Sequence, residues 1–336
     1  MIQTLSKAEA TRRMNELGKA QEPFLFIIDF EMEQPIVLKL DEIPAQSLLY
    51  DFNGKRNFKE APVSEKEVFF EKHPVTEAQY HGAFQLVMDH IKAGNSYLVN
   101  LAFPTPISTN IGLREAFFRS RARYRLWLKG QFTCFSPEPF ITIDENGRIA
   151  SFPMKGTIDA ALPDAQQLLL DNAKEKAEHA TIVDLIRNDL SMVAGNVRVK
   201  RYRYIEEIGT HQGGLLQSSS EITGQLESGY QNRLGDIVFQ LLPAGSISGA
   251  PKRKTVEIIQ AAERQPRGYY TGICGYFDGR ELDSGVMIRF IEQTPGGLVF
   301  KSGGGITANS KMQDEYLEMA RKAYLPFASA PELVAR

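Results

Sequence analysis

The order of helical and strand-like segments constrains the fold of this 336-residue chain more than any other feature. Apolar residues recur every three or four positions in some segments and every second position in others, which predicts helices and strands respectively. The predicted strands follow one another as hairpins, for example around the turn Asn146-Gly147, without regular alternation with helices. This order favours an α+β fold with antiparallel sheets over a parallel, doubly wound fold.

The segments themselves are predicted from periodicity, caps and turn residues. Thr76 can cap a helix, and Asp171-Asn172 can break and recap a long one. We expect helices at 6–19, 77–94, 113–121, 162–190 in two pieces, 232–242, 251–263 and 311–325. We expect strands at 24–30, 36–40, 96–103, 124–128, 131–135, 140–143, 148–152, 197–208, 215–226, 268–277, 284–292 and 298–301.

Composition excludes several classes of protein. A net charge of −2 provides no field that would attract nucleic acid or an anionic membrane. The longest apolar runs, such as 23–28, are far too short to span a bilayer, and the N-terminus does not resemble a signal peptide. Cys134 and Cys274 lie outside any metal-binding or redox motif. We therefore expect a cytosolic protein that binds a small molecule, with no nucleic-acid or membrane partner.

One lysine stands between residues that fix its backbone. In Ser-Phe-Pro-Met-Lys-Gly-Thr, which begins at Ser151, Pro153 fixes φ and Gly156 permits a turn, so Lys155 is held in place. Apolar residues alternate around it, as at a strand end that enters an interior. Desolvation there would lower the pKa of Lys155 and make its amine a nucleophile near neutral pH. The alternative is a surface lysine at the corner of a strand and a loop.

Three glutamates are candidates for binding a divalent cation. Glu315 and Glu318 share one face of the last predicted helix with Lys322, and carboxylates at this spacing suit Mg²⁺. Glu178 lies on another helix, where the charged run Arg-Asn-Asp from Arg187 interrupts an apolar pattern. The alternatives are a solvated helix face for the first set and a structural ion-pair network for the second.

Two glycine-rich segments are interpreted as loops that bind anions. The segment 245–252 enters a helix, where free amides and the helix dipole can receive a carboxylate. Gly303-Gly304-Gly305 offers further backbone amides without side chains in the way. Arg289 alternates with apolar residues in a predicted strand and can bind a carboxylate in bidentate fashion.

Taken together, these motifs resemble those of the chorismate-binding enzymes. The motifs are Pro-Met-Lys-Gly-Thr, Glu178 with Val-Asp-Leu-Ile-Arg-Asn-Asp, Pro-Ala-Gly-Ser-Ile-Ser-Gly-Ala-Pro-Lys, Arg-Gly-Tyr-Tyr-Thr-Gly and Gly-Gly-Gly-Ile-Thr-Ala-Asn-Ser, within about 76–327. The resemblance implies large antiparallel sheets packed as a sandwich with helices outside. It also implies a catalytic core at 76–327, an N-terminal portion at 1–75 packed into the same domain, and a tail at 328–336.

The resemblance also implies roles for individual residues. With lysine at position 155 the chain resembles the aminodeoxychorismate synthases of the family, whereas anthranilate synthases usually carry alanine there. Lys155 would attack C2 of chorismate while Glu138 assists the departure of the C4 hydroxyl. Mg²⁺ would be bound by Glu178 and Glu318 with Glu315 beside them. The residues implied to hold the substrate are Arg289, Tyr270, Lys322, Gly303, Gly305 and Ser246.

The implied reaction is the amination of chorismate to 4-amino-4-deoxychorismate, which leads to 4-aminobenzoate and folate. No glutaminase arrangement is evident, so ammonia would come from a separate glutamine amidotransferase. Anthranilate synthase component I and a non-catalytic chorismate-binding subunit are the alternatives. Leu98 and Gln217 depart from the family pattern, which leaves the roles of both positions open, and a bound regulatory tryptophan is not supported.

Overall fold

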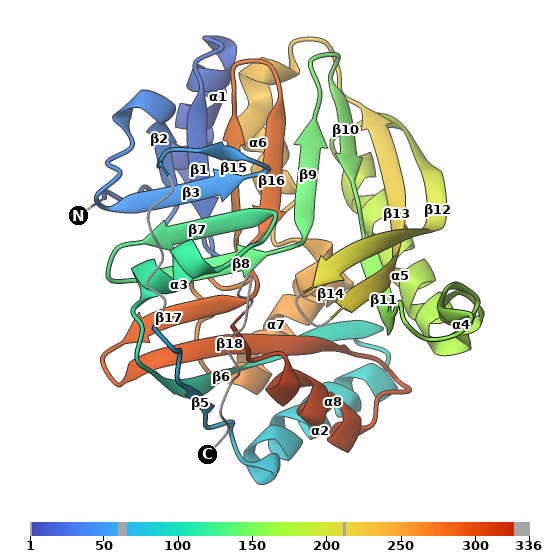
Figure 1. Ribbon diagram of the computed structural model, residues 1–336. Helices are drawn as coiled ribbons and strands as arrows, with labels where there is room; N and C mark the ends of the chain where they lie inside the picture. Colours follow the sequence, from blue (N-terminus) through green and yellow to red (C-terminus); the bar gives the residue numbers. More distant parts are fainter. Residues whose placement is uncertain (1, 60–65, 211–212, 326–336) are drawn as a thin grey trace.

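The computed structural model describes residues 2–59, 66–210 and 213–325, and the predicted tail at 328–336 lies outside them. Within these ranges two large antiparallel sheets pack together with helices around them (Figure 1). The α+β class predicted from the order of the segments is confirmed. None of the helices in the described ranges has the length and apolar character needed to cross a membrane.

Sheet 1 contains nine strands in the described part of the chain. Its long strand β13 (Gly213–Gln225) has β12 (Gly195–Thr210) on one edge and both β11 (Met154–Asp159) and β10 (Arg148–Ser151) on the other. From β10 the order continues with β9 (Pro139–Ile143), β16 (Leu282–Val286), β15 (Ile273–Phe277), β1 (Phe24–Ile28) and β2 (Ile36–Lys39).

Sheet 2 also contains nine described strands. In spatial order they are β14 (Gly249–Ala250), β6 (Leu98–Thr109), β18 (Gly297–Ile306), β17 (Phe290–Thr294), β8 (Phe132–Ser136), β7 (Tyr124–Leu128), β3 (Leu48–Phe52) and β4 (Lys55–Arg56), with β5 (Phe70–Lys72) beside β6. The first 75 residues thus contribute strands to both sheets.

Alternation along β1 shows how the core is divided. Successive side chains of a strand point to opposite faces. Leu25 and Ile27 belong to an apolar cluster with residues of β7 and β8, so this face packs against sheet 2. Phe24 and Phe26 belong to a second cluster with residues of the helices. Sheet 1 is therefore buried on both faces at this point.

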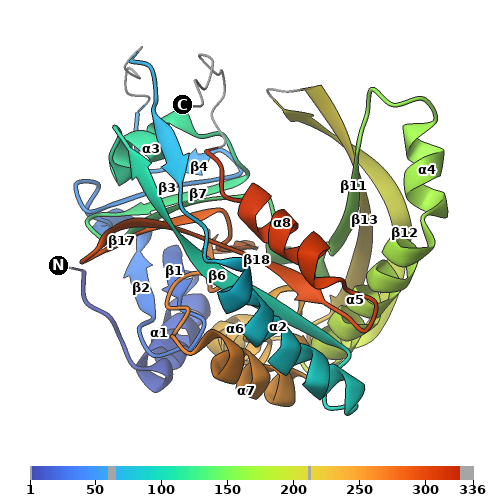
Figure 2. The same cartoon turned by 90° about the horizontal axis from the view of Figure 1, so that it is seen from below.

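The helices surround the sheets, and Figure 2 shows α4 and α5 beside β12 and β13, with α8 beside β18. Thr76 caps α2 through a reciprocal capping box, and Asn172 caps α5, as predicted from the sequence. The helices are α1 (Lys7–Lys19), α2 (Glu77–Lys92), α3 (Leu113–Arg119), α4 (Ala165–Asp171), α5 (Ala173–Ser191), α6 (Leu234–Gln240), α7 (Lys252–Glu263) and α8 (Met312–Arg321), with short 3₁₀ turns η1 (Leu40–Glu42), η2 (Tyr230–Arg233) and η3 (Gly245–Ile247).

Three predicted elements near the site differ from the structure. The strand predicted at 284–292 is two strands, β16 in sheet 1 and β17 in sheet 2, and Arg289 lies between them with a φ of 52°. The strand predicted at 268–277 begins only at Ile273. Gly303-Gly304-Gly305 belongs to β18 and pairs with β6, so it is not a loop. In each case pairing between distant segments decides the backbone, which local sequence patterns do not contain.

Candidate active site

A cavity of about 450 Å³ lies between β11 and α5 on one side and β18 and α8 on the other. We call it the central cavity. The structure brings all of the predicted site residues to its walls: Lys155, Glu138, Arg289, Tyr270, Lys322, Gly303, Gly305, Ser246, Glu178, Glu315 and Glu318. They come from segments that are up to 184 positions apart in the sequence, from Glu138 to Lys322. Their roles stay predictions.

Lys155 lies at an irregular point of β11. The register against β13 shifts between Met154 and Thr157, and Gly156 has a φ of 86°, so the predicted turn at this glycine is present. The Lys155 Nζ atom lies 3.0 Å from Glu178 Oε2 on α5. The side chains of Lys155 and Glu178 are 28% and 13% exposed. The lysine is therefore held inside the cavity by an ion pair between a strand and a helix.

This ion pair changes the protonation state that the sequence predicted for Lys155. Burial alone would lower the pKa of Lys155, but the carboxylate of Glu178, with Glu175 and Glu318 nearby, raises it, and the net direction is upward. The prediction of a neutral amine is therefore wrong for the protein without bound ligands. Lys155 is an ammonium group until its carboxylate partners are engaged elsewhere.

Two glycines of β18 direct backbone amides into the cavity. The β6 residues opposite Gly303 and Gly305 are Ala102 and Asn100, which donate their N–H groups to other partners at 2.8 and 2.9 Å. In an antiparallel pair, residues that do not bond to each other both direct their N–H and C=O groups outward. The Gly303 carbonyl accepts a hydrogen bond from Lys322 Nζ at 2.9 Å on this outer edge. The strand thus presents the amides that were predicted from a loop.

The carboxylates of α8 lie directly against β18. Glu318 Oε1 is 2.7 Å from Lys322 Nζ, and Glu315 Oε1 accepts a hydrogen bond from Ser310 Oγ at 2.7 Å. A Cβ atom added at Gly304 would lie 3.4 Å from Glu315 and 3.9 Å from Glu318. The predicted shared face of the helix is present, and the glycine gives both carboxylates room at the cavity wall.

The donor set in the cavity fits a hard divalent cation, but the side chains do not enclose one. Among the described residues, no three His, Cys, Asp or Glu side chains lie close enough together to hold a metal ion. Glu178 faces Lys155 on one wall, while Glu315 and Glu318 lie on the other. The lining contains five glutamates and four basic side chains, so a substrate with two carboxylates would leave negative charge to be balanced. Carboxylate oxygens are the ligands that Mg²⁺ prefers.

Glu138 lies in the loop between β8 and β9. Its carboxylate accepts a hydrogen bond from Ser246 Oγ at 2.5 Å, and its backbone carbonyl accepts one from the Val286 N–H at 3.0 Å. Burial raises the pKa of Glu138 more than Ser246, Lys155 and Lys322 lower it. A carboxyl group in this setting retains its proton to higher pH than an ordinary glutamate, which suits a proton donor.

The segment that contains Ser246 differs from the prediction made for it. Ser246 belongs to η3, and Gly249 and Ala250 pair with β6 as strand β14. The start of α7 is not among the residues that line the central cavity. The segment therefore contributes a side chain, Ser246, in place of the predicted helix amides.

Arg289 lies at the end of the cavity near α8, and Tyr270 also lines the cavity. Arg289 Nη1 donates to the Lys322 carbonyl at 3.0 Å, and its guanidinium lies 4.7 Å from the centre of the Tyr324 ring. This arginine therefore also binds the C-terminal end of α8. Burial raises the pKa of Tyr270, so its phenol keeps its proton and can donate to an anion.

Sequence reasoning missed several residues of the cavity wall. Glu175 lies one helical turn before Glu178, so helical spacing gave a signal for it. Asn100 and Thr271 also line the cavity, and no local pattern distinguishes them. Gln217 and Leu98 line it as well, which places both departures from the family pattern at the site; the buried Gln217 Oε1 has no hydrogen-bond partner in the described structure.

Comparison with known proteins identifies the class. The model of the chorismate binding enzyme family matches residues 5–327, and the chain belongs to this family. The match extends further toward the N-terminus than the motifs do.

Individual relatives narrow the resemblance. The chain is 53% identical over 316 residues to an uncharacterized PabA-like protein of Haemophilus influenzae, with 94% of this chain and 96% of that protein covered. It is 34% identical over 261 residues to aminodeoxychorismate synthase component 1 of Escherichia coli, with 73% of this chain covered. The match spans 56% of that relative's length.

Solved structures share the fold. The menaquinone-specific isochorismate synthase of Escherichia coli superposes with a TM-score of 0.72 at 18% identity, over 95% of this chain and 81% of that one. Anthranilate synthase component I of Streptococcus pneumoniae superposes with a TM-score of 0.65 at 24% identity, over 78% and 60%. The sandwich of large antiparallel sheets is thus shared with chorismate-utilising enzymes.

Proposed function

We propose that this protein converts chorismate and ammonia to 4-amino-4-deoxychorismate, an intermediate on the way to 4-aminobenzoate and folate. The observation that carries the proposal is that Lys155 and Glu138 both line the central cavity. A Cβ atom added at Gly305 would lie 3.8 Å from Lys155 Nζ, so the amine lies close to β18 at this glycine. The aminodeoxychorismate synthase relatives at 33% and 34% identity support the choice of reaction.

The substrate carboxylates would bind at the α8 end of the cavity. Arg289 and Lys322 supply positive charge there, and the Gly303 and Gly305 amides supply donors. Tyr270 would add a neutral hydrogen-bond donor. Glu178, Glu315 and Glu318 would hold Mg²⁺, which when bound would neutralise a carboxylate of chorismate. This arrangement would place the ring of the substrate between the two walls.

The chemistry then follows from two side chains. The neutral amine of Lys155 forms a bond to C2 of chorismate as the C4–O bond breaks, and Glu138 gives the leaving hydroxyl the proton with which it departs as water. Ammonia next forms a bond to C4 while the C2–N bond to Lys155 breaks, which releases the free amine. Because Glu178 raises the pKa of Lys155, the attack requires that this ion pair be broken in the substrate complex.

Ammonia would come from a separate glutamine amidotransferase. Glutamine hydrolysis of that kind uses an accessible cysteine nucleophile. Both cysteines of this chain, Cys134 and Cys274, are fully buried. The protein would therefore act as the chorismate-binding partner of a glutaminase, and its cytosolic location stays a prediction.

The test is a reaction of the purified protein with chorismate, Mg²⁺ and ammonium, with the products separated by mass. We expect 4-amino-4-deoxychorismate, which keeps the enolpyruvyl group, and a severe loss of this product with Lys155→Ala. Anthranilate, which lacks that group, would establish the anthranilate synthase alternative. Binding of chorismate without any product would establish the non-catalytic alternative.

A further inference from the structure

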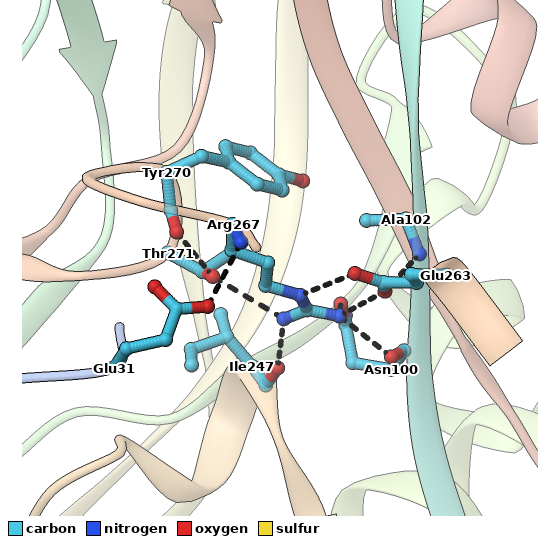
Figure 3. Close-up of polar contacts among 8 residues, drawn as sticks. All are labelled: Glu31, Asn100, Ala102, Ile247, Glu263, Arg267, Tyr270 and Thr271. Atoms are coloured by element: carbon cyan, nitrogen blue, oxygen red, sulfur yellow. Dashed lines mark hydrogen bonds and ion pairs between the residues drawn. The ribbon is translucent and has the colours of Figure 1, made fainter. Parts of the chain in front are cut away.

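A buried ion pair lies behind the central cavity, between Arg267 and Glu263 (Figure 3). Their side chains are 2% and 3% exposed. Arg267 Nε donates to Glu263 Oε2 at 3.0 Å, and Arg267 Nη2 donates to Glu263 Oε1 at 2.6 Å. Glu263 is the last residue of α7, and Arg267 follows in the loop before β15. Neither residue lines the central cavity.

The guanidinium joins four separate segments of the chain. An arginine has five N–H donors in a fixed plane. Besides the two bonds to Glu263, Nη1 donates to the Ile247 carbonyl at 2.9 Å and to Thr271 Oγ1 at 3.2 Å, and Nη2 donates to the Asn100 carbonyl at 2.8 Å. These acceptors lie in η3, in the turn before β15 and in β6. Each of the five donors thus has a partner.

Glutamate partners fix the surrounding backbone further. Glu263 Oε1 also accepts the Ala102 N–H of β6 at 2.8 Å. Glu31 accepts the backbone N–H groups of Arg267 at 2.8 Å and of Gly268 at 3.0 Å. The loop that carries the arginine is therefore tied both to β6 and to the chain after β1.

Three of the four contacted segments, all except α7, carry residues of the cavity wall. Asn100, Ile247 and Thr271 line the cavity themselves. Ser246, next to Ile247, holds the Glu138 carboxylate, and Tyr270 lies next to Thr271. A change at the guanidinium would therefore reach the cavity through the loop of Ser246 and through the turn of Tyr270.

Burial of the Arg267–Glu263 pair costs free energy, which indicates that its role is to fix geometry more than to stabilise the fold. Two buried charges must be removed from water, and such a pair often stabilises a protein no more than apolar side chains would. Thr271 has a φ of 61°, which a β-branched residue rarely adopts and which persists only where the surroundings hold it. Its hydroxyl bonds to Arg267, and its N–H donates to the Met287 carbonyl at 2.8 Å. The network thus fixes a strained conformation, so defined geometry is its main contribution.

We propose that Arg267 and Glu263 are positioning residues of this site. They hold the Ser246–Ile247 loop and the Tyr270–Thr271 turn against β6 in one arrangement, so that Ser246 meets Glu138 and Tyr270 faces the cavity. The assay of this inference rests on the proposed amination of chorismate.

A double-mutant cycle tests the proposal. A lysine at 267 has three donors, so Arg267→Lys should lower kcat about 30-fold or more, because at least two acceptors lose their partner. Ser246→Ala alone should lower kcat about 10-fold. If the arginine acts through Ser246, the double variant should fall no more than about 3-fold below Arg267→Lys. Losses in kcat that multiply in full, or a kcat for Arg267→Lys equal to wild type, would overturn the proposal.

A matched control separates positioning from stability. Arg119 and Glu115 on α3 form another arginine–glutamate pair four residues apart, with the Arg119 side chain 7% exposed, and neither lines the central cavity. Arg119→Lys should lower the melting temperature while kcat stays at the wild-type value. Should Arg267→Lys not fold, Glu263→Gln keeps the shape of the side chain and replaces it in the cycle with the same criteria.

The outcome also distinguishes this inference from the proposed function. Absence of aminated product from the wild-type protein overturns the proposed function. The same cycle is then measured on chorismate consumption or, without turnover, on the dissociation constant of chorismate. Coupled losses again support the positioning role, and fully independent losses overturn it.

Discussion

The two walls of the central cavity each carry a lysine paired with a glutamate, and the two pairs are built differently. Lys322 and Glu318 lie four residues apart at the end of one helix, and the Glu318 side chain is 54% exposed. Lys155 and Glu178 lie 23 residues apart, on β11 and α5, and the Glu178 side chain is 13% exposed. The first pair needs only a helix, whereas the second exists only after a sheet and a helix pack.

The difference in exposure decides how strongly each lysine depends on its glutamate partner. An exposed ion pair contributes little, because water solvates each partner when the other leaves. A buried charge that loses its partner is destabilised strongly. Loss of the Glu178 carboxylate should therefore destabilise the charged form of Lys155 more than loss of Glu318 destabilises that of Lys322.

Among the changes at the two lysine–glutamate pairs, removal of the buried Lys155 should have the largest effect on activity. We expect Lys155→Ala to lower the rate of amination about 1,000-fold or more, because the proposed covalent step has no other nucleophile. Chorismate should still bind within about 3-fold of wild type, since binding is assigned to the other wall. Product formation by mass and calorimetric titration of chorismate measure the two quantities. A variant that keeps a tenth of the rate would exclude Lys155 as the nucleophile.

Substitution of Glu178 and of Glu318, one on each wall, should show how much each contributes to Mg²⁺ binding. We expect Glu178→Gln to lower kcat/KM about 100-fold and Glu318→Gln about 10-fold, because both lose a ligand but Glu178 has the more buried carboxylate. Chelation by EDTA should abolish activity of the wild type, and added Mg²⁺ should restore it. The midpoint of the Mg²⁺ titration should rise in both variants. Full activity in EDTA would contradict the cation site.

The raised pKa of Glu138 predicts how kcat/KM depends on pH. Burial raises the pKa of Glu138, so the proton needed by the leaving hydroxyl is present below that pKa, and kcat/KM should fall as pH rises through it. Ser246, Lys155 and Lys322 each lower the pKa of Glu138. Ser246→Ala removes one of these contributions and should move the fall to higher pH. The pH–rate profiles of both proteins measure the shift, and a move to lower pH would refute the assignment.

Removal of the exposed pair should have the smallest effect. We expect Lys322→Met to change the free energy of unfolding by less than about 1 kcal/mol, because the pair with Glu318 is partly solvated. The KM for chorismate should rise about 10-fold with kcat little changed, as for an interaction made equally in the ground and transition states. Urea unfolding and steady-state kinetics provide the measurements. A large drop in kcat would assign Lys322 to the chemistry.

Local patterns predicted much of the fold and less of its long-range pairing. Thr76 and Asn172 cap their helices as expected, since a cap depends on a few neighbouring residues. The division of 284–292 into β16 and β17 was missed, because β-branched and aromatic residues on both sides of Arg289 favour a strand and only their partners decide which sheet each part joins. Gly303–Gly305 was interpreted as a loop for the same reason, although its pairing with β6 makes it a strand.

Motifs predicted the members of the site but not their electrostatic state. All of the predicted residues line one cavity, because they were assigned through motifs that belong together in one enzyme family. The direction of the pKa shift of Lys155 depends on Glu178, whose proximity no local pattern contains. The partners of Arg267 likewise come from four segments, so its contacts follow only from the packed structure.

The passage of the chain between the sheets at Met287–Arg289 limits how the protein can open. Four Cα-to-Cα steps from Val286 to Phe290 reach at most about 15 Å, and packed sheets lie about 10 Å apart. The sheets can therefore separate there by only a few ångströms before a strand end unpairs. This short connection contains Arg289 and therefore holds the two sheets close together at the wall of the cavity.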